Sequence, residues 1–157
     1  MYDRILVPLD GSDVSESMLP HAIELARRCG SSVVLLEVVE SLGQAMAVMA
    51  PTEPSLVTPE ATEAIIEGVE AEEASARTYL AGVAEKFRAA GASVETLVVS
   101  GSPGIEIARV AEERGADVIA ICSHGRGGLG RALLGSVADY LIHHVKIPVL
   151  VLRHQGS

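Results

Sequence analysis

Short runs of aliphatic residues recur five times along the chain, and segments with helical periodicity separate most of them. Several runs are uninterrupted, which is typical of strands buried on both faces, because a strand with one wet face alternates apolar and polar residues. Such strands, alternating with helices, indicate a parallel sheet with right-handed crossovers. The sequence therefore predicts an α/β fold: a doubly wound, five-stranded parallel sheet with helices on both faces. We expect its strands at 4–9, 33–39, 94–99, 117–121 and 147–152.

The segments between these runs predict four helices and one long loop. Apolar residues at helical spacing run from Leu19 to Ala26. Pro20 lies inside this expected helix, and we expect it to kink the helix or displace a backbone bond. A long helix ends at Gly91, and two others cover 103–114 and 137–144. The segment 41–59 contains three prolines and no clear period, so it is expected to be a loop. The chain shows no internal repeat, and we expect one domain over 1–157.

Composition narrows the class of protein. Hydrophobic residues make up 48% of the chain and aromatic residues 3%, so the core is expected to be aliphatic. A formal net charge of −9 argues against binding to nucleic acid or to anionic membranes, because both require a cationic surface. The sequence shows no signal-peptide pattern, no transmembrane run and no disulfide framework, so we expect a cytoplasmic protein.

A glycine-rich segment follows the fourth expected strand. It contains Gly125, Gly127 and Gly130, and Gly135-Ser136 stands directly before the last expected helix. Glycine lets backbone N–H groups approach an anion closely, and a helix N-terminus attracts phosphate. The segment is therefore interpreted either as a phosphate site or as a surface loop followed by a capped helix, with Ser136 at the N-cap or in the first turn.

The segment does not match the common nucleotide-binding loops. It fits G-x-G-x-x-G letter by letter, but a dinucleotide fingerprint would follow the first strand and open a helix at once. Lys86 and Lys146 are the only lysines, and neither follows glycine as in a Walker loop.

Polar residues near the expected strand ends are further candidates. Asp10 follows the first strand, where it could bind a ribose hydroxyl or a base amine, or form a turn. His124 could donate to a phosphate or cap the loop. Cys122 is interpreted as a small buried residue, with a ligand-facing thiol as the alternative. The adjacent His143 and His144 are expected to interact with a helix C-terminus rather than to bind a metal.

Together these residues resemble the universal stress protein family. The resemblance runs from Ile5-Leu-Val-Pro-Leu-Asp-Gly-Ser12 to Ile147-Pro-Val-Leu-Val-Leu-Arg153. Its most specific part is the ATP-binding pattern G-x-x-G, nine residues, G-[ST]. Gly125 and Gly135-Ser136 match this pattern, whereas Cys122 stands in place of the first glycine. The run from Ser123 to Arg126 is similar to the ATP-binding branch of the family.

The resemblance implies binding of ATP, or of AMP or ADP, with magnesium as a further expectation. It also implies a homodimer through the strand 147–152, which would otherwise be an exposed apolar edge. The nucleotide-binding residues expected from it and from the candidates above are Pro8, Leu9, Asp10, Val38, Ile121, Ser123, His124, Gly125, Arg126, Gly127, Gly135, Ser136 and Val137.

Three classes of function remain open. The first is an ATP-binding stress-response or signalling module with slow or no hydrolysis and with unidentified protein partners. The second is a nucleotide-independent interaction protein of the same fold with a degenerate pocket, which Cys122 and the acidic charge favour. The third, an enzyme, ranks last because no Walker lysine or paired catalytic residue accompanies the glycines. We therefore expect at most weak ATPase activity, and we assign no catalytic residue and no metal ligand.

Overall fold

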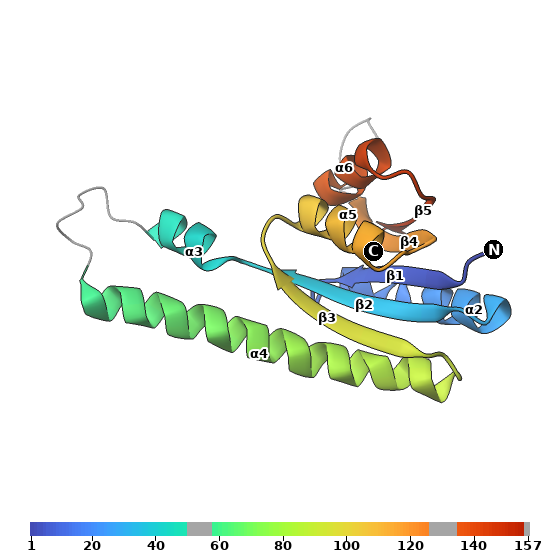
Figure 1. Ribbon diagram of the computed structural model, residues 1–157, viewed down its shortest axis with the longest axis horizontal. Coiled ribbons are helices and arrows are strands. Elements are labelled where there is room, and N and C mark those ends of the chain that lie inside the picture. Colours follow the sequence, from blue (N-terminus) through green and yellow to red (C-terminus); the bar gives the residue numbers. More distant parts are fainter. Residues whose placement is uncertain (50–57, 126–134, 156–157) are drawn as a thin grey trace.

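A computed structural model of the chain describes residues 1–49, 58–125 and 135–155. In this part, five strands form one parallel sheet (Figure 1), as the sequence predicts. Their spatial order is β3 (Val94–Ser100), β2 (Ser32–Val39), β1 (Arg4–Leu9), β4 (Val118–Gly125) and β5 (Val149–Gln155). The chain thus begins in the middle of the sheet, builds one side outward to β3, and then returns to build the other side.

Helices cover both faces of the sheet (Figure 1). On one face lie α1 (Asp13–Glu16), α2 (Leu19–Cys29) and α4 (Pro59–Ala89), and on the other lie α5 (Pro103–Glu113) and α6 (Ser136–His144). Alternate strand residues enter opposite layers: Ile5 and Val7 pack with α2 and α4, whereas Leu6 packs with α5 and α6. Both layers are mainly aliphatic, as the composition predicts.

The prediction that Pro20 lies inside a helix and kinks it is wrong. The first helical segment is divided, because α1 ends at Glu16 and α2 begins at Leu19. Pro20 therefore lies in the first turn of α2, where a backbone N–H has no intrahelical partner to lose, and it does not kink the helix.

The prediction of a loop over 41–59 is wrong for its first part, which forms α3 (Leu42–Met49). A capping box starts this helix: the Ser41 N–H donates to Gln44 Oε1 at 2.9 Å, and the Gln44 N–H donates to Ser41 Oγ at 3.2 Å. Helix-favouring Ala and Met residues follow, and the prolines begin only at Pro51. Residues 50–57 lie outside the described part, and α4 begins at Pro59 after its N-cap Thr58.

Two strands end several residues beyond their predicted limits, whereas the bounds of the other three agree within one residue. β4 continues to Gly125 and β5 to Gln155, with Ser123 opposite Arg153 and His124 opposite His154. The pairing is made by backbone groups, so the polar side chains that ended the apolar pattern do not end the strands. β5 begins at Val149 rather than at 147.

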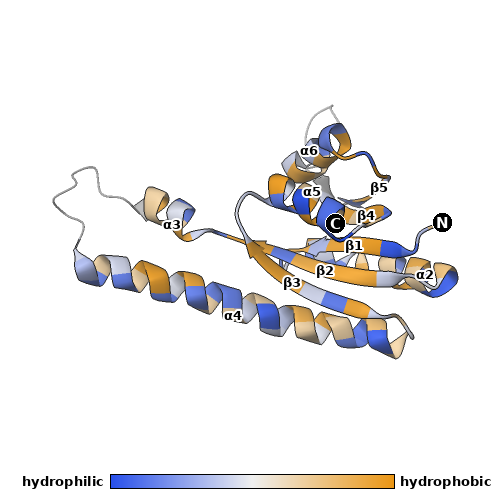
Figure 2. Cartoon of the chain, in the orientation of Figure 1, coloured by the Kyte–Doolittle hydropathy of each residue, from blue (hydrophilic) through white to orange (hydrophobic). Residues whose placement is uncertain are grey.

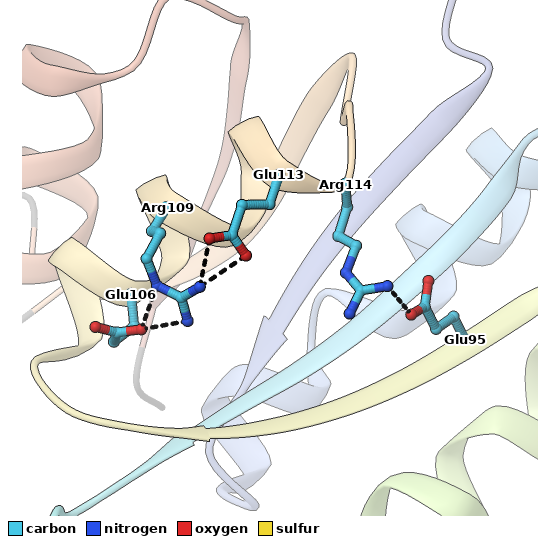
Figure 3. A network of polar contacts seen from close by, with 5 residues as sticks. All are labelled: Glu95, Glu106, Arg109, Glu113 and Arg114. Carbon is cyan, nitrogen blue, oxygen red and sulfur yellow. Dashed lines mark hydrogen bonds and ion pairs between the residues drawn. The ribbon is translucent and has the colours of Figure 1, made fainter.

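Ion pairs lie on the outer side of α5 (Figure 3). Arg109 lies between Glu106 and Glu113, with a nitrogen–oxygen distance of 2.7 Å to each, and Arg114 pairs with Glu95 of β3 at 2.6 Å. Exposed pairs of this kind contribute only about 0–1 kcal/mol. Burial of the opposite side of α5 therefore holds the helix on the sheet. No helix in the described ranges is long and apolar enough to cross a membrane.

Candidate functional site

A cleft of about 220 Å³ opens at the carboxyl ends of β1 and β4. These strands are neighbours in the sheet but not in the sequence. The chain runs from β1 to β2 and β3 on one side of β1, and then crosses through α5 to β4 on the other side of β1. Such a switch point leaves a crevice, because successive crossovers pass over opposite faces. The N-termini of α1, α5 and α6 border the same opening.

Nine of the thirteen residues expected to bind nucleotide line this cleft. Two more, His124 and Gly125, continue β4 directly beyond the lining residue Ser123. Arg126 and Gly127 lie outside the described residues. The nine lining residues are Pro8, Leu9, Asp10, Val38, Ile121, Ser123, Gly135, Ser136 and Val137. The structure therefore brings together four separate stretches of the sequence, and their role in binding stays a prediction.

Asp10 forms a tight turn at the end of β1. Its Oδ1 accepts hydrogen bonds from the Ser12 N–H at 3.0 Å and from Ser12 Oγ at 2.5 Å. Gly11 between them has a φ of 76°, which L-residues with a side chain rarely adopt. The prediction that Asp10 forms a turn is confirmed. The same hydrogen bonds hold this exposed carboxylate at the edge of the cleft, where it could accept a hydrogen bond from a ligand hydroxyl or amine.

The opposite end of the cleft is the N-terminus of α6. Ser136 is the first helical residue, and Gly135 is the N-cap, with no side chain that caps the helix. The N–H groups of the first turn have no intrahelical carbonyl to bind, and the helix dipole adds positive potential there. This end of the cleft is therefore suited to an anion.

Ser123 forms part of the floor. Its side chain is 4% exposed, and its Oγ has no hydrogen-bond partner among the described residues. A buried hydroxyl without a partner is unfavourable, so such atoms need an explanation, which a bound ligand would supply. Ser123 is one of the residues that line the cleft, so a polar ligand group beside it would supply the missing partner.

The neighbouring Cys122 also borders the cleft and is half-buried. Burial raises the pKa of its thiol, and the negative charge of Asp10 raises it further. Since the thiolate is the reactive form of cysteine, this side chain is a small neutral group rather than a nucleophile. The interpretation of Cys122 as a small, partly buried residue is confirmed, since its side chain packs against the layer of α2 and α4. The ligand-facing thiol stays a prediction.

The walls between the two polar ends are apolar. Val38 and Ile121 belong to the sheet, and Ile107 belongs to α5. Such walls suit a flat, weakly polar ring better than a charged group. Sequence reasoning missed the contributions of α1 and α5, although both helices follow strand ends directly. The lining residues missed in this way are Ser12, Val14, Ser15, Pro103 and Ile107, together with Ala138 of α6.

The described residues contain no group of three or more side chains placed to hold a metal ion. His143 and His144 each place Nδ1 near the carbonyl oxygen four residues earlier in α6, at 2.8 and 2.7 Å. This agrees with their expected role at the helix C-terminus. Within the described lining, Asp10 is the single charged side chain.

Comparisons with known proteins agree with this architecture. A family model described as the universal stress protein family matches residues 1–153. The universal stress protein Sll1388 of a Synechocystis strain is 30% identical over 98% of this chain and 99% of its own. The universal stress protein MJ0531 of Methanocaldococcus jannaschii is 35% identical over 98% of this chain and 83% of its own.

Solved structures give the same result. The structure of MJ0577 covers 100% of this chain and 99% of its own, with a TM-score of 0.76 and 29% identity. The universal stress protein from Archaeoglobus fulgidus in complex with dAMP covers 96% of this chain and 97% of its own, with a TM-score of 0.61 and 25% identity.

Proposed function

The chain belongs to the universal stress protein family, and we propose that it is an ATP-binding member that acts as a stress-response or signalling module. One observation carries this proposal: a fixed carboxylate, an apolar slot and an uncapped helix N-terminus meet in one cleft. These three features match, in order, the ribose, the base and the phosphates of a nucleotide. The dAMP bound to the Archaeoglobus fulgidus relative supports an adenine nucleotide as the ligand.

In the proposed complex, the nucleoside lies at the β1 end and the phosphates lie at α6. Asp10 accepts hydrogen bonds from ribose hydroxyls, and Val38 packs against the base. The N–H groups that follow Gly135 donate to phosphate oxygens, and the hydroxyl of Ser136 donates to a further one. We propose that magnesium enters with the phosphates, as the counterion of the bound ATP.

Hydrolysis in this complex is slow. Fast phosphoryl transfer needs a positioned nucleophile and cations that neutralise the charge of the transferred group. The charged side chain of the described lining, Asp10, lies at the nucleoside end. We expect single-turnover hydrolysis far below the roughly 1–100 s⁻¹ of kinases.

We further propose that the whole chain, 1–157, acts as one nucleotide-binding domain. It works in the cytoplasm, and it forms a homodimer through β5.

A second candidate function is interaction with a partner without any nucleotide. Cys122 favours it, because it stands in place of a motif glycine in the lining of the cleft. Nucleotide that co-purifies with the protein, detected by absorbance and mass, would decide against this candidate.

The test of the nucleotide proposal is calorimetric titration of ATP, ADP and AMP into the wild type and two variants. In Gly135→Val, a branched side chain stands at the N-cap beside the phosphates, and we expect no measurable binding in a folded protein. Gly82→Val is the matched control, since a Cβ on this glycine of α4 meets nothing within 4 Å. Equal affinity of folded Gly135→Val and wild type would contradict the phosphate site, and absence of binding by the wild type would contradict the function.

A further inference from the structure

The first half of α4 lies outside the sheet. All buried residues of this 31-residue helix, from Ala76 to Phe87, belong to its second half. The first half continues past the end of the strands, with α3 beside it (Figure 1). We call α3 together with residues 59–75 of α4 the arm. At a rise of about 1.5 Å per residue, its α4 part is about 25 Å long.

The arm exposes apolar side chains. Seven large hydrophobic residues are exposed in the described part of the chain, and three of them lie on the arm: Leu42 at 39%, Val48 at 79% and Ile66 at 37%. Orange segments alternate with blue ones along this half of α4 (Figure 2). Apolar side chains that continue along a helix beyond the part packed on the core are typical of interaction surfaces.

The same half of α4 is strongly acidic. Six glutamates and no Lys, Arg or His lie between residues 59 and 73, whereas residues 74–89 contain one glutamate, one lysine and two arginines. Glu60, Glu63, Glu67 and Glu70 recur at spacings of three and four, so they share one side of the helix, and all are exposed. Ile66 lies three residues from Glu63 and four from Glu70, on the edge of this stripe.

Neither the helix dipole nor local ion pairing accounts for this stripe. The dipole acts within about the first turn, where Glu60 is the acidic residue. On α5, by contrast, Arg109 pairs with Glu106 and Glu113. The four carboxylates of the stripe have no ion-pair partner among the described residues, and their mutual repulsion is uncompensated.

We propose that the arm is a docking surface for a cationic amphipathic helix of a partner protein. Exposed apolar groups beside a row of carboxylates are complementary to a helix with an apolar face flanked by Lys and Arg. A second copy of this chain is a poor occupant, because it would bring a second row of carboxylates against the first. The proposal is independent of nucleotide, since none of these arm residues lines the cleft.

The probe is a synthetic helix of about 18 residues, long enough to cover the arm, with leucines on one face and lysines beside them. Its binding to the full chain is measured by fluorescence anisotropy at two ionic strengths. A peptide of the same pattern with glutamate in place of lysine is the peptide control. We expect the cationic helix to bind, more weakly at higher salt, and the acidic helix not to bind.

Two triple variants with the same net charge locate the site. Glu63→Gln/Glu67→Gln/Glu70→Gln removes the stripe, and we expect binding to weaken about tenfold, as for the loss of three exposed charge pairs. The control, Glu85→Gln/Glu112→Gln/Glu113→Gln, removes three exposed carboxylates elsewhere, and we expect unchanged binding. Ile66→Ser should also weaken binding, and circular dichroism confirms that each variant is folded.

Each other outcome overturns the proposal. Equal weakening in both triple variants would mean general attraction to an acidic protein rather than a site. A change in the sedimentation of the protein alone on Ile66→Ser would mean that a second copy covers the arm. Absence of binding by the cationic helix would exclude the proposed partner chemistry.

Discussion

Ser123 Oγ and Glu37 Oε2 are buried and lack hydrogen-bond partners in the described part of the chain. They differ in what they affect, ligand binding or stability. Ser123 Oγ belongs to a residue that lines the cleft. Glu37 Oε2 is on β2, next to Val38 but directed to the opposite face, because successive strand residues alternate. The first atom therefore bears on binding, and the second bears on stability.

We predict that Ser123→Ala separates stability from affinity. Removal of a buried hydroxyl without a partner leaves the free energy of unfolding unchanged or slightly higher. If a nucleotide accepts or donates a hydrogen bond at this hydroxyl, its affinity falls by about 0.5–1.5 kcal/mol. Urea unfolding without ligand and calorimetry with ATP measure the two effects.

Ser31→Ala is the control for Ser123→Ala, with the opposite pattern. The Ser31 hydroxyl is buried and donates to the carbonyl of Tyr2, far from the cleft. This variant should lose about 1 kcal/mol of stability and keep its affinity. A loss of stability in Ser123→Ala like that in Ser31→Ala would show that the Ser123 hydroxyl already has a partner.

Glu37 makes stability depend on pH. Burial raises the pKa of its carboxyl, and the charges of Asp10 and Glu72 raise it further. Below the unfolded-state pKa the group is protonated in both states and costs nothing. As pH rises from the unfolded-state pKa to the raised folded-state pKa, the unfolded state releases this proton more readily than the folded state, so stability is lost. Above the folded-state pKa the loss is complete.

Glu37→Gln should therefore be more stable than the wild type at neutral pH. The difference should shrink toward about pH 4, where the wild-type carboxyl is protonated as well. Thermal unfolding without nucleotide across this range measures it. A glutamine variant that is less stable at neutral pH would mean that the ionised carboxylate has a stabilising partner.

At the scale of elements, α4 consists of two halves with different roles. Phe87 is fully buried in the core, whereas Ile66 on the arm is 37% exposed. Phe87→Ala should lower the free energy of unfolding by about 3–5 kcal/mol, and Ile66→Ala should change it by about 0.5 kcal/mol or less. Denaturant unfolding of both variants checks this contrast. A large loss for Ile66→Ala would show that the arm is part of the folded core.

The strands were predictable because burial on both faces requires an uninterrupted run of apolar residues, such as the run that follows Arg4 up to Leu9. α3 was not predicted, because the three prolines between 51 and 59 led to a loop prediction for the whole segment 41–59. Ser41 and Gln44, however, carry the sequence signature of a capping box. Before Pro20, a short helix capped by Ser12 ends, and Ser17 beyond its end lies 3.2 Å from His154 of β5, a long-range contact that periodicity does not report.

At the scale of the whole molecule, the position of the cleft was predictable from topology. Parallel strands with right-handed crossovers place Asp10, Val38 and the start of α6 at the same edge of the sheet. The part played by Pro103 and Ile107 was not, because it depends on how far α5 leans over the opening. Tertiary packing sets that distance, and no local pattern encodes it.

The homodimer through β5 stays a prediction, and the structure allows a sharp test of it. β5 is an edge strand of the described sheet, paired on one side with β4, and its Leu150 is 44% exposed. An apolar edge of this kind invites pairing, and two copies related by a two-fold axis would cover it. The strand ends at Gln155, so the polar residues Arg153 and His154 would also lie within the interface or at its rim.

Leu150→Glu should convert the dimer to a folded monomer. The substitution places like charges near the two-fold axis, so each copy repels the other, while a side chain already half-exposed tolerates the change within one subunit. Ile105→Glu, at a 52% exposed position on α5, is the matched control and should leave the dimer intact. Sedimentation velocity measures both. A wild type that sediments as a monomer, or a Leu150→Glu variant that remains a dimer, would mean that β5 is left open or is covered in another way.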